Sequence, residues 1–281
     1  MTATQKREIE TLAARIRLDI LDETHAAKSG HPGGSLSIAD LMAYLYTCEL
    51  RVDPKNPKDP DRDRLVLSKG HTAPALYAAL ARKGFFPPET LITLRKIDSE
   101  LQGHPDMNKT PGVDMTSGSL GQGLSAACGM AWAAKKDGKS YRTYAIVGDG
   151  ESQEGQIWEA CMFAAHYKLD NLCLILDWNG LQIDGAIEEV MNPTPYKEKF
   201  ESFGFHVVCI DGHDLDQIES ALNEARSVKG KPTAIVMKTV KGKGVSYMEN
   251  QAGWHGKAPN ADEFAIAKAG LEAKIKELEE N

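Results

Sequence analysis

Two polar side chains follow apolar segments that have the length and β-branched content of buried strands. Asp149 stands between two glycines directly after the run 143–147, and Asn179 follows the run 172–176. Because the carboxyl ends of parallel strands meet at one edge of a sheet, we expect Asp149 and Asn179 to lie close together. A carboxylate, an amide oxygen and a main-chain carbonyl such as that of Leu181 suit Mg²⁺ or Ca²⁺, with diphosphate oxygens completing the shell. The pattern predicts a metal site that holds a diphosphate.

Histidines beside glycines form a second group of candidate residues. Five of the eight histidines adjoin a glycine. Histidine titrates near neutrality and glycine lets the backbone approach a substrate, so such loops suit proton transfer on a polyhydroxylated molecule. We interpret four of them in this way: His31, His71, His104 and His255. The fifth, His213, lies in an acidic turn, where we expect a solvated loop.

The elements around these residues follow from glycine and apolar spacing. The glycines at 148 and 150 favour a tight turn into a helix that runs from about residue 153 to 169. The glycine-rich segment 28–35 is predicted to be a loop before a helix that begins near Ser37. A further glycine-rich loop, 116–123, precedes the alanine-rich helix 124–136. It suits either a cofactor contact or close packing of that helix, and both remain open.

Strands and helices alternate over most of the chain. This pattern predicts an α/β fold, doubly wound, with a mainly parallel sheet covered by helices on both faces. We expect one domain over residues 1–281, with an N-terminal helix at about 5–27 and a C-terminal helix at about 262–281. The strands are expected at 65–67, 143–147, 172–176, 206–210 and 233–240. Residues 90–96 are predicted to be helical, 187–195 to be a loop, and Lys241 to lie in an ordinary lysine-glycine turn.

Composition narrows the class of protein. With 33 basic and 40 acidic residues the net charge is −7, which argues against nucleic acid or an anionic membrane as the main partner. The absence of a long apolar run or secretory signal predicts a cytoplasmic protein. Five widely spaced cysteines are expected to be reduced core residues.

Several motifs together resemble one enzyme family. The segment Gly148-Asp149-Gly150, followed by Asn179 about thirty residues later, is similar to the thiamine diphosphate motif, and its continuation through Gly155 resembles that of transketolases. Other transketolase-like motifs occur in the family's order: Ser-Gly-His-Pro-Gly at His31, Lys-Gly-His at His71, Gly-His-Pro at His104, Gly-Ser-Leu-Gly-Gln-Gly from Gly118, and His-Gly at His255. The resemblance extends from about residue 28 to 257.

The resemblance implies a role for each matching residue. Asp149, Asn179 and the Leu181 carbonyl would hold Mg²⁺ or Ca²⁺ on the diphosphate of thiamine diphosphate. The other implied cofactor-binding residues are His71, Gly118, Leu120, Gly150, Glu154 and Asn179, of which Glu154 would also lie in a subunit contact. His31, His104 and His255 would line the substrate channel as catalytic residues. The family's first asparagine is Trp178 here, which leaves Asn179 in place.

The implied reaction is transfer of a two-carbon ketol unit from a ketose, or its phosphate, to an aldose. A full transketolase continues into a pyrimidine-binding domain, whose glutamate activates the cofactor, and into a further domain. We therefore expect an N-terminal subunit of a split transketolase, completed as a heterotetramer by a C-terminal subunit that carries the pyrimidine-binding domain.

Three alternatives remain at this stage. One is another thiamine diphosphate enzyme, such as a deoxyxylulose-phosphate synthase or a component of a 2-oxo acid dehydrogenase. The second is a cofactor-binding subunit without catalysis, and the third is a transketolase of specialised sugars. The Gln153-Glu154-Gly155 continuation and the four loop histidines favour transketolase.

Overall fold

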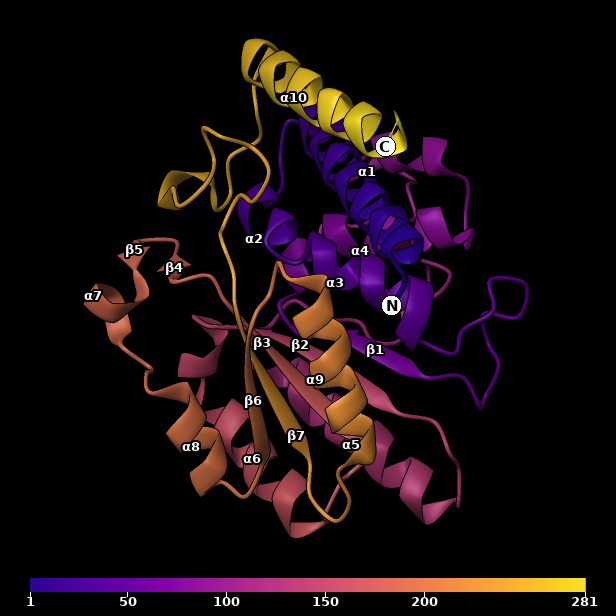
Figure 1. The fold of residues 1–281 in the computed structure, drawn as a ribbon, viewed down its shortest axis with the longest axis vertical. Helices are drawn as coiled ribbons and strands as arrows, with labels where there is room; N and C mark the ends of the chain where they lie inside the picture. Colours follow the sequence, from indigo (N-terminus) through magenta and orange to yellow (C-terminus); the bar gives the residue numbers. More distant parts are fainter. Residues whose placement is uncertain (281) are drawn as a thin grey trace.

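A parallel sheet forms the centre of the molecule. The structure is a computed structural model that describes residues 1–280, and within them one sheet has five strands in the order β1-β2-β3-β7-β6, all parallel (Figure 1). The strands are β1 (Arg64–Leu67), β2 (Thr143–Gly148), β3 (Leu172–Trp178), β6 (His206–Asp211) and β7 (Thr233–Lys238). All five lie where the sequence predicts them. The strand order brings β7 beside β3, although β6 precedes β7 in the chain.

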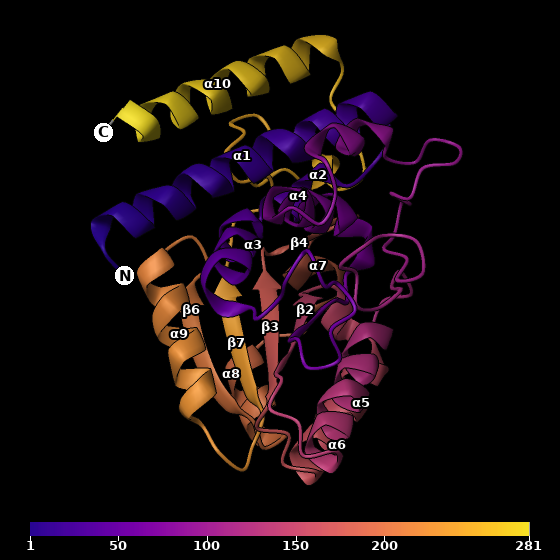
Figure 2. The same ribbon diagram turned by 90° about the vertical axis from the view of Figure 1, so that its right-hand side faces the viewer.

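Helices cover both faces of the sheet, which confirms the predicted fold class (Figure 2). One face carries α5 (Gln122–Lys136), α6 (Gly155–His166) and α8 (Tyr196–Ser202). The other carries α3 (Ala39–Tyr44) and α9 (Leu215–Ser227), with α1 (Ala3–Ala27) and α4 (Ala73–Lys83) packed beyond them. The helix α10 (Ala261–Glu280) lies along α1. It matches the C-terminal helix expected at 262–281, of which residue 281 lies outside the described part.

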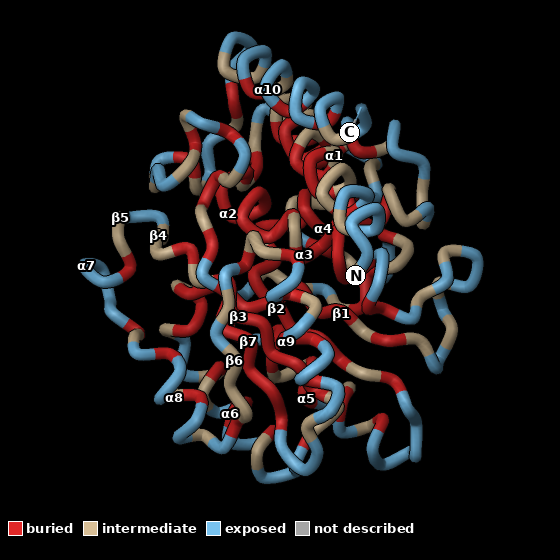
Figure 3. Tube along the Cα trace, in the orientation of Figure 1, coloured by how far each residue is buried: buried red, intermediate tan, exposed pale blue. Residues whose placement is uncertain are grey.

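Alternation along each strand divides the core in two. In β3, Leu172, Leu174 and Leu176 pack against α5, α6 and α8, whereas Cys173 and Ile175 face the α1, α3 and α4 side. Side chains in a strand point alternately to opposite faces, and both faces are covered, so residues 172–176 of β3 are all apolar. Figure 3 shows the resulting buried centre within an exposed periphery.

Several short elements differ from the predictions. The segment expected to be a loop before Ser37 contains α2 (Pro32–Leu36), whose proline stands at a first-turn position where the missing N–H costs nothing. The helix expected at 90–96 is a 3₁₀-helix, η3 (Pro88–Thr93). The expected loop 187–195 begins with α7 (Ile187–Met191). The remaining short elements are η1 (Leu45–Glu49), η2 (Gly70–Thr72), η4 (Glu151–Gln153), β4 (Leu181–Gln182), β5 (Gly185–Ala186) and η5 (Ala252–Trp254).

The cysteines are not all core residues. Cys128, Cys161 and Cys173 are buried, but Cys48 and Cys209 are exposed, and all five are free thiols. Cys209 belongs to β6, the edge strand of the sheet, where neighbouring side chains are only half-buried. Among residues 1–280, no helix has both the length and the apolar character needed to span a bilayer.

Close packing of α5 on the sheet accounts for one of its glycines. A Cβ atom built on Gly123 would lie 2.5 Å from Ser68 Oγ and 2.6 Å from Ser68 Cα, just beyond β1. Of the two interpretations of the glycine-rich segment, the structural one therefore holds for Gly123. Ser68 in turn binds a buried carboxylate of the pocket described below, so this contact also positions the site.

Gly123→Ala is expected to lower the free energy of unfolding by about 1–3 kcal/mol, because the new methyl group overlaps the Ser68 backbone. Gly129→Ala in the same helix is the matched control. A Cβ there meets no described atom within 4 Å, so this change should stabilise the protein by about 0.5–1 kcal/mol through helix propensity. Urea unfolding of both variants checks the prediction, and equal effects would contradict it.

Candidate functional site

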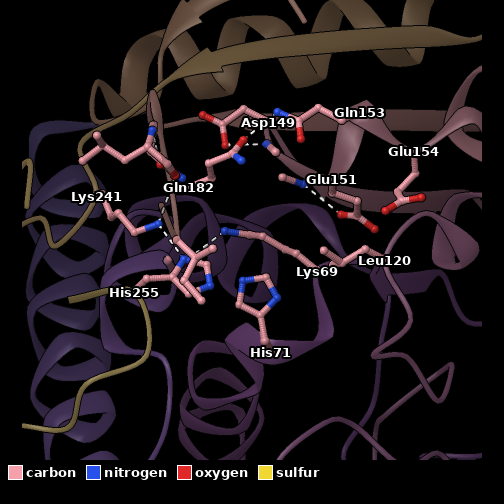
Figure 4. A pocket seen from close by; sticks show the side chains of 16 residues that line it. Lys69, His71, Leu120, Asp149, Glu151, Gln153, Glu154, Gln182, Lys241 and His255 are labelled. Carbon is pink, nitrogen blue, oxygen red and sulfur yellow. Dashed lines mark hydrogen bonds between the residues drawn. The ribbon is translucent and has the colours of Figure 1, made fainter. Parts of the chain in front are cut away.

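A pocket of about 340 Å³ lies at the carboxyl ends of β2 and β3 (Figure 4). This volume is within the range of small-molecule sites. Ligands of open parallel sheets bind at this edge, where strands give way to loops and helix N-termini. The residues that line it are Gly34, Lys69, His71, Leu120, Gly148, Asp149, Gly150, Glu151, Gln153, Glu154, Asn179, Leu181, Gln182, Ile183, Lys241 and His255.

The three predicted metal ligands all line this pocket. Asp149 is 3% exposed and accepts hydrogen bonds from the Gly150 N–H at 2.8 Å and from the Gly180 N–H at 2.6 Å. The Asn179 side-chain oxygen accepts from the Leu181 N–H at 3.1 Å. Burial, and then the nearby Asp177 carboxylate, raise the pKa of Asp149 to about 6. A cation beside Asp149 would offset this cost of burial.

The donor set fits a hard cation held on a diphosphate. Within residues 1–280, no group of three or more His, Cys, Asp or Glu side chains is placed to hold a metal ion by itself. The predicted set contains one carboxylate, one amide oxygen and one main-chain carbonyl, so it needs ligand oxygens to complete a shell of the size that Mg²⁺ or Ca²⁺ takes.

Asp177, which the sequence analysis did not single out, binds two residues that line the pocket, Lys69 and Asn179. It is fully buried and accepts hydrogen bonds from Lys69 Nζ at 2.6 Å, Ser37 Oγ at 2.8 Å, Thr239 Oγ1 at 2.5 Å and Asn179 Nδ2 at 3.0 Å. Burial alone would raise the pKa of Asp177, but Lys69 and the hydroxyl donors lower it. Because Asp177 holds the Asn179 amide nitrogen, the Asn179 oxygen is left for other partners.

The prediction of an ordinary lysine-glycine turn is wrong for Lys241. Residues 241–244 do form a turn, but the Lys241 side chain is not solvated. Its side chain is buried, and Nζ donates to the Leu181 carbonyl at 3.1 Å and to His255 Nδ1 at 3.0 Å. Burial lowers the pKa of Lys241 to about 8. Figure 4 shows the ammonium beside His255 and facing the pocket. A buried ammonium at this position is suited to bind an anion such as a diphosphate.

Three of the four loop histidines come together. The ring centroids of His31 and His71 are 5.1 Å apart, those of His31 and His255 5.4 Å, and those of His71 and His255 5.2 Å. His31 Nδ1 is buried and finds no hydrogen-bond partner among residues 1–280. His104 lies apart on an exposed loop, and a Cβ on Gly118 would lie 3.1 Å from its ring. The arrangement therefore joins His31, His71 and His255 and leaves His104 at the side of Gly118.

All four histidines favour the neutral form. Burial is the main cause, and the neighbouring cations and imidazoles add to it. The pKa falls to about 4 for His31, about 2 for His71 and about 3 for His255, and it is also lowered for His104. A neutral imidazole has a lone pair that can accept a hydroxyl proton at neutral pH.

The remaining predicted residues divide between the wall of the pocket and its surroundings. Gly150, Leu120 and Glu154 line the pocket, and Leu120 and Glu154 are exposed. In the described part of the chain, the pocket wall does not include Gly118, His31 or His104. Gly150 has an ordinary helical φ of −63°, and a Cβ atom there would lie 3.4 Å from Gln182 Cβ, so neither a left-handed turn nor crowding requires glycine at this position.

Glu151 is a second buried carboxylate that sequence reasoning missed. It accepts hydrogen bonds from Ser68 Oγ at 2.5 Å and from the N–H groups of Gly121 and Gly148, each at 2.9 Å. It thereby ties the glycine-rich loop before α5 to the end of β2. Lys69, Asp177 and Lys241 lie at or just beyond the ends of the predicted strands, and this position could have marked them as candidate site residues. Lys241 could be placed in the pocket only once β7 was known to pair with β3.

His213 does not lie in a solvated loop as predicted. Its side chain is only 13% exposed, Nδ1 contacts Asp40 Oδ2 at 2.7 Å, and Nε2 accepts the Val240 N–H at 2.9 Å. The acidic turn folds back onto α3 because Asp40 and the end of β7 provide partners for both ring nitrogens.

Fold and pocket together define a parallel α/β domain with a small-molecule cavity at its strand ends. The chain belongs to the transketolase family: the family model described as "Transketolase, thiamine diphosphate binding domain" matches residues 9–277. The chain is thus a thiamine diphosphate-binding domain.

Relatives of two lengths match the chain. The 6-deoxy-6-sulfo-D-fructose transketolase subunit SqwG of Clostridium sp. (strain MSTE9) is 48% identical over 95% of this chain and 98% of its own. A subunit of the apulose-4-phosphate transketolase of Phocaeicola vulgatus is 41% identical over 98% of both chains. The transketolase of Homo sapiens is 46% identical over 89% of this chain but 40% of its own, so the chain spans about two-fifths of that relative. A crystal structure of a Pichia stipitis transketolase superposes with a TM-score of 0.88 and 30% identity, covering 98% of this chain and 45% of that one.

Asp177→Asn is expected to lower the free energy of unfolding by about 3–5 kcal/mol, because it leaves the Lys69 ammonium buried without a counter-charge. Asp170→Asn is the matched control. It breaks another Asp–Lys pair, in which the Lys135 and Asp170 side chains are 36% and 22% exposed, and should cost at most about 1 kcal/mol. Denaturant unfolding measures both, and a small effect at Asp177 would contradict the assignment.

The cofactor-free chain is expected to keep His31, His71 and His255 neutral from pH 8 down to about 5.5. Their folded-state pKa values lie below the unfolded value, so the folded chain binds fewer protons than the unfolded chain in this range. Their contribution to stability is therefore present above about pH 6.5 and is lost as the pH falls toward the folded pKa values. Nitrogen NMR of labelled imidazoles, with free histidine as reference, tests this, and protonation of these three near pH 6.5 would refute it.

Proposed function

We propose that this chain is the thiamine diphosphate-binding subunit of a two-subunit transketolase. Joined to a second polypeptide, it transfers a two-carbon ketol unit from a ketose to an aldose, each free or phosphorylated. The observation that carries the proposal is the pocket at the strand ends. There, oxygen ligands for a cation, a buried ammonium and a cluster of neutral histidines line or border one cavity.

In this proposal one side of the pocket holds the diphosphate. Asp149, Asn179 and the Leu181 carbonyl would hold Mg²⁺ or Ca²⁺, which would neutralise negative charge of the diphosphate. Lys241, whose ammonium lies 3.1 Å from the same Leu181 carbonyl, neutralises further negative charge of the diphosphate. The Gly150 backbone and His71 lie beside the diphosphate, while Gly118 and Leu120 approach the rest of the cofactor.

The histidines handle the protons of the sugar. Thiamine diphosphate, when bound, supplies the nucleophilic carbon that takes up the ketol unit. A neutral His255 or His31 accepts the proton of the C3 hydroxyl as the C2–C3 bond breaks and the aldose leaves. It then donates a proton to the aldehyde oxygen of the acceptor aldose as the new carbon–carbon bond forms. His31 Nδ1, buried without a partner in the described chain, is free for such a hydroxyl. His104, beside Gly118, lines the substrate channel. Glu154, exposed at the pocket rim, lies in the subunit contact.

The lengths of the relatives support the two-subunit organisation. Two relatives named as transketolase subunits match this chain over nearly their whole length, whereas the human transketolase matches over 40% of its own. A second polypeptide carrying a pyrimidine-binding domain would complete the cofactor site, in a heterotetramer. That residues 1–281 form one domain stays a prediction.

A specialised sugar is the second candidate for the substrate. The relatives that match end to end are named for 6-deoxy-6-sulfo-D-fructose and for apulose-4-phosphate. Both names describe sugars that carry an anionic group. We therefore propose an anionic ketose as the donor, within the same ketol transfer.

Asp149→Ala is expected to weaken Mg²⁺-dependent binding of thiamine diphosphate by about 100-fold or more, because it removes the one charged ligand of the cation. Asp137→Ala, which removes an exposed carboxylate at the end of α5, is the control. Calorimetric titration of the chain with its partner, with and without Mg²⁺, measures the change. Unchanged affinity in Asp149→Ala would refute the metal site.

The purified chain alone is expected to show no ketol transfer, and the reconstituted pair should exchange ketol units between ketose and aldose. Pyruvate offered as the donor provides the contrast with other thiamine diphosphate enzymes. Activity of the isolated chain would overturn the two-subunit proposal. Turnover of pyruvate without ketol transfer would overturn the transketolase reaction.

A further inference from the structure

The segment that follows β7 carries Lys241 into the pocket. Its first residue, Thr239, still donates its N–H to the Trp178 carbonyl of β3 at 3.0 Å. Val240, one residue further, donates its N–H to the imidazole nitrogen Nε2 of His213 at 2.9 Å. The imidazole therefore continues the support of this backbone where the strand pairing ends, immediately before Lys241.

The second nitrogen of His213 is anchored to a buried ion pair. Because Nε2 accepts an N–H group, the ring proton of the neutral imidazole resides on Nδ1, which donates to Asp40 at 2.7 Å. Arg17 donates to both oxygens of Asp40, to Oδ1 at 3.0 Å and to Oδ2 at 2.5 Å. The side chains of Arg17 and Asp40 are only 10% and 13% exposed.

The same network reaches the backbone on the other side of Lys241. Arg17 Nε donates to the Lys243 carbonyl at 3.1 Å, while His213 holds Val240. A single buried cluster, Arg17-Asp40-His213, thus binds the chain before and after Lys241. It connects α1, α3 and the turn before α9 to the pocket.

The Lys241 side chain has little freedom once its backbone is fixed. A Cβ atom on Gly33 would lie 3.1 Å from Lys241 Cγ and 3.3 Å from Cε, so the stem lies directly against the backbone of α2. The ammonium then falls between the Leu181 carbonyl and His255 Nδ1. A displacement of the 240–243 backbone would move the ammonium away from both partners.

We propose that His213 is a positioning residue for diphosphate binding: by joining Asp40 to the Val240 N–H, it sets the place of the Lys241 ammonium in the pocket. This rests on the proposed function, in which Lys241 binds the diphosphate. His213 itself does not line the pocket. It lines a neighbouring surface depression that shares Asn179 with the pocket, so its effect on the ligand passes through the backbone.

Three substitutions test this role of His213. In His213→Gln the side-chain amide can donate to Asp40 and accept from Val240, so the connection can form again. In His213→Leu neither bond can form, although the apolar volume is similar. Lys241→Met removes the ammonium while keeping most of the stem.

The test is calorimetric titration of the full chain with inorganic pyrophosphate and Mg²⁺, a probe that needs only the diphosphate end of the site. His213→Leu should raise the Kd about tenfold or more, and His213→Gln by less than about threefold. Combining His213→Leu with Lys241→Met should weaken binding no further than Lys241→Met alone, because the first change acts through the second residue.

Each outcome of these titrations supports or overturns the positioning role of His213. Full additivity of the two changes, wild-type affinity in His213→Leu or in Lys241→Met, or equal losses in the Gln and Leu variants would overturn the positioning role. If His213→Leu does not fold, His213→Ser takes its place, since a serine is too short to connect Asp40 with Val240. Failure of the wild-type chain to bind thiamine diphosphate in the presence of its partner would instead refute the proposed function, and this inference with it.

Discussion

The site depends on one buried carboxylate. Asp177, at the end of the central strand β3, receives the Lys69 ammonium, two hydroxyl groups and the Asn179 amide. These donors come from the ends of β1, β3 and β7 and from the segment between α2 and α3. A buried charge is tolerated only when its bonds are satisfied, so the strand ends are held in one arrangement. The orientation of Asn179, and hence the predicted cation site, follows from this constraint.

The pocket contains a buried carboxylate, Asp149, and a buried ammonium, Lys241, which together suit a ligand that has both a positive and a negative group. Burial raises the pKa of Asp149 to about 6 and lowers that of Lys241 to about 8, so each group pays for desolvation in the free chain. A cation beside Asp149 and an anion beside Lys241 would relieve both costs. A metal-bound diphosphate is the simplest ligand that meets both requirements.

The sequence predicted the elements better than their arrangement. Short apolar runs separated by helical patterns located all five strands. The glycine-flanked Asp149 led to Asn179, because both residues follow strongly apolar strands that are neighbours in sequence and in space. Lys241 was taken for an ordinary turn and Asp177 was passed over, since periodicity does not give strand order. His213 was misplaced for a related reason: its partners, Asp40 and Val240, are distant in sequence and come together only in the folded chain.

The central claim is that Asp149 and its neighbours hold a metal ion on the diphosphate of thiamine diphosphate. It is tested most directly by replacing Mg²⁺ with Mn²⁺ and recording electron–nuclear double resonance spectra of the chain assembled with its partner and the cofactor. The account predicts strong hyperfine coupling of the bound Mn²⁺ to the phosphorus nuclei. Bound Mn²⁺ without phosphorus coupling, or cofactor bound equally well without any metal, would contradict it.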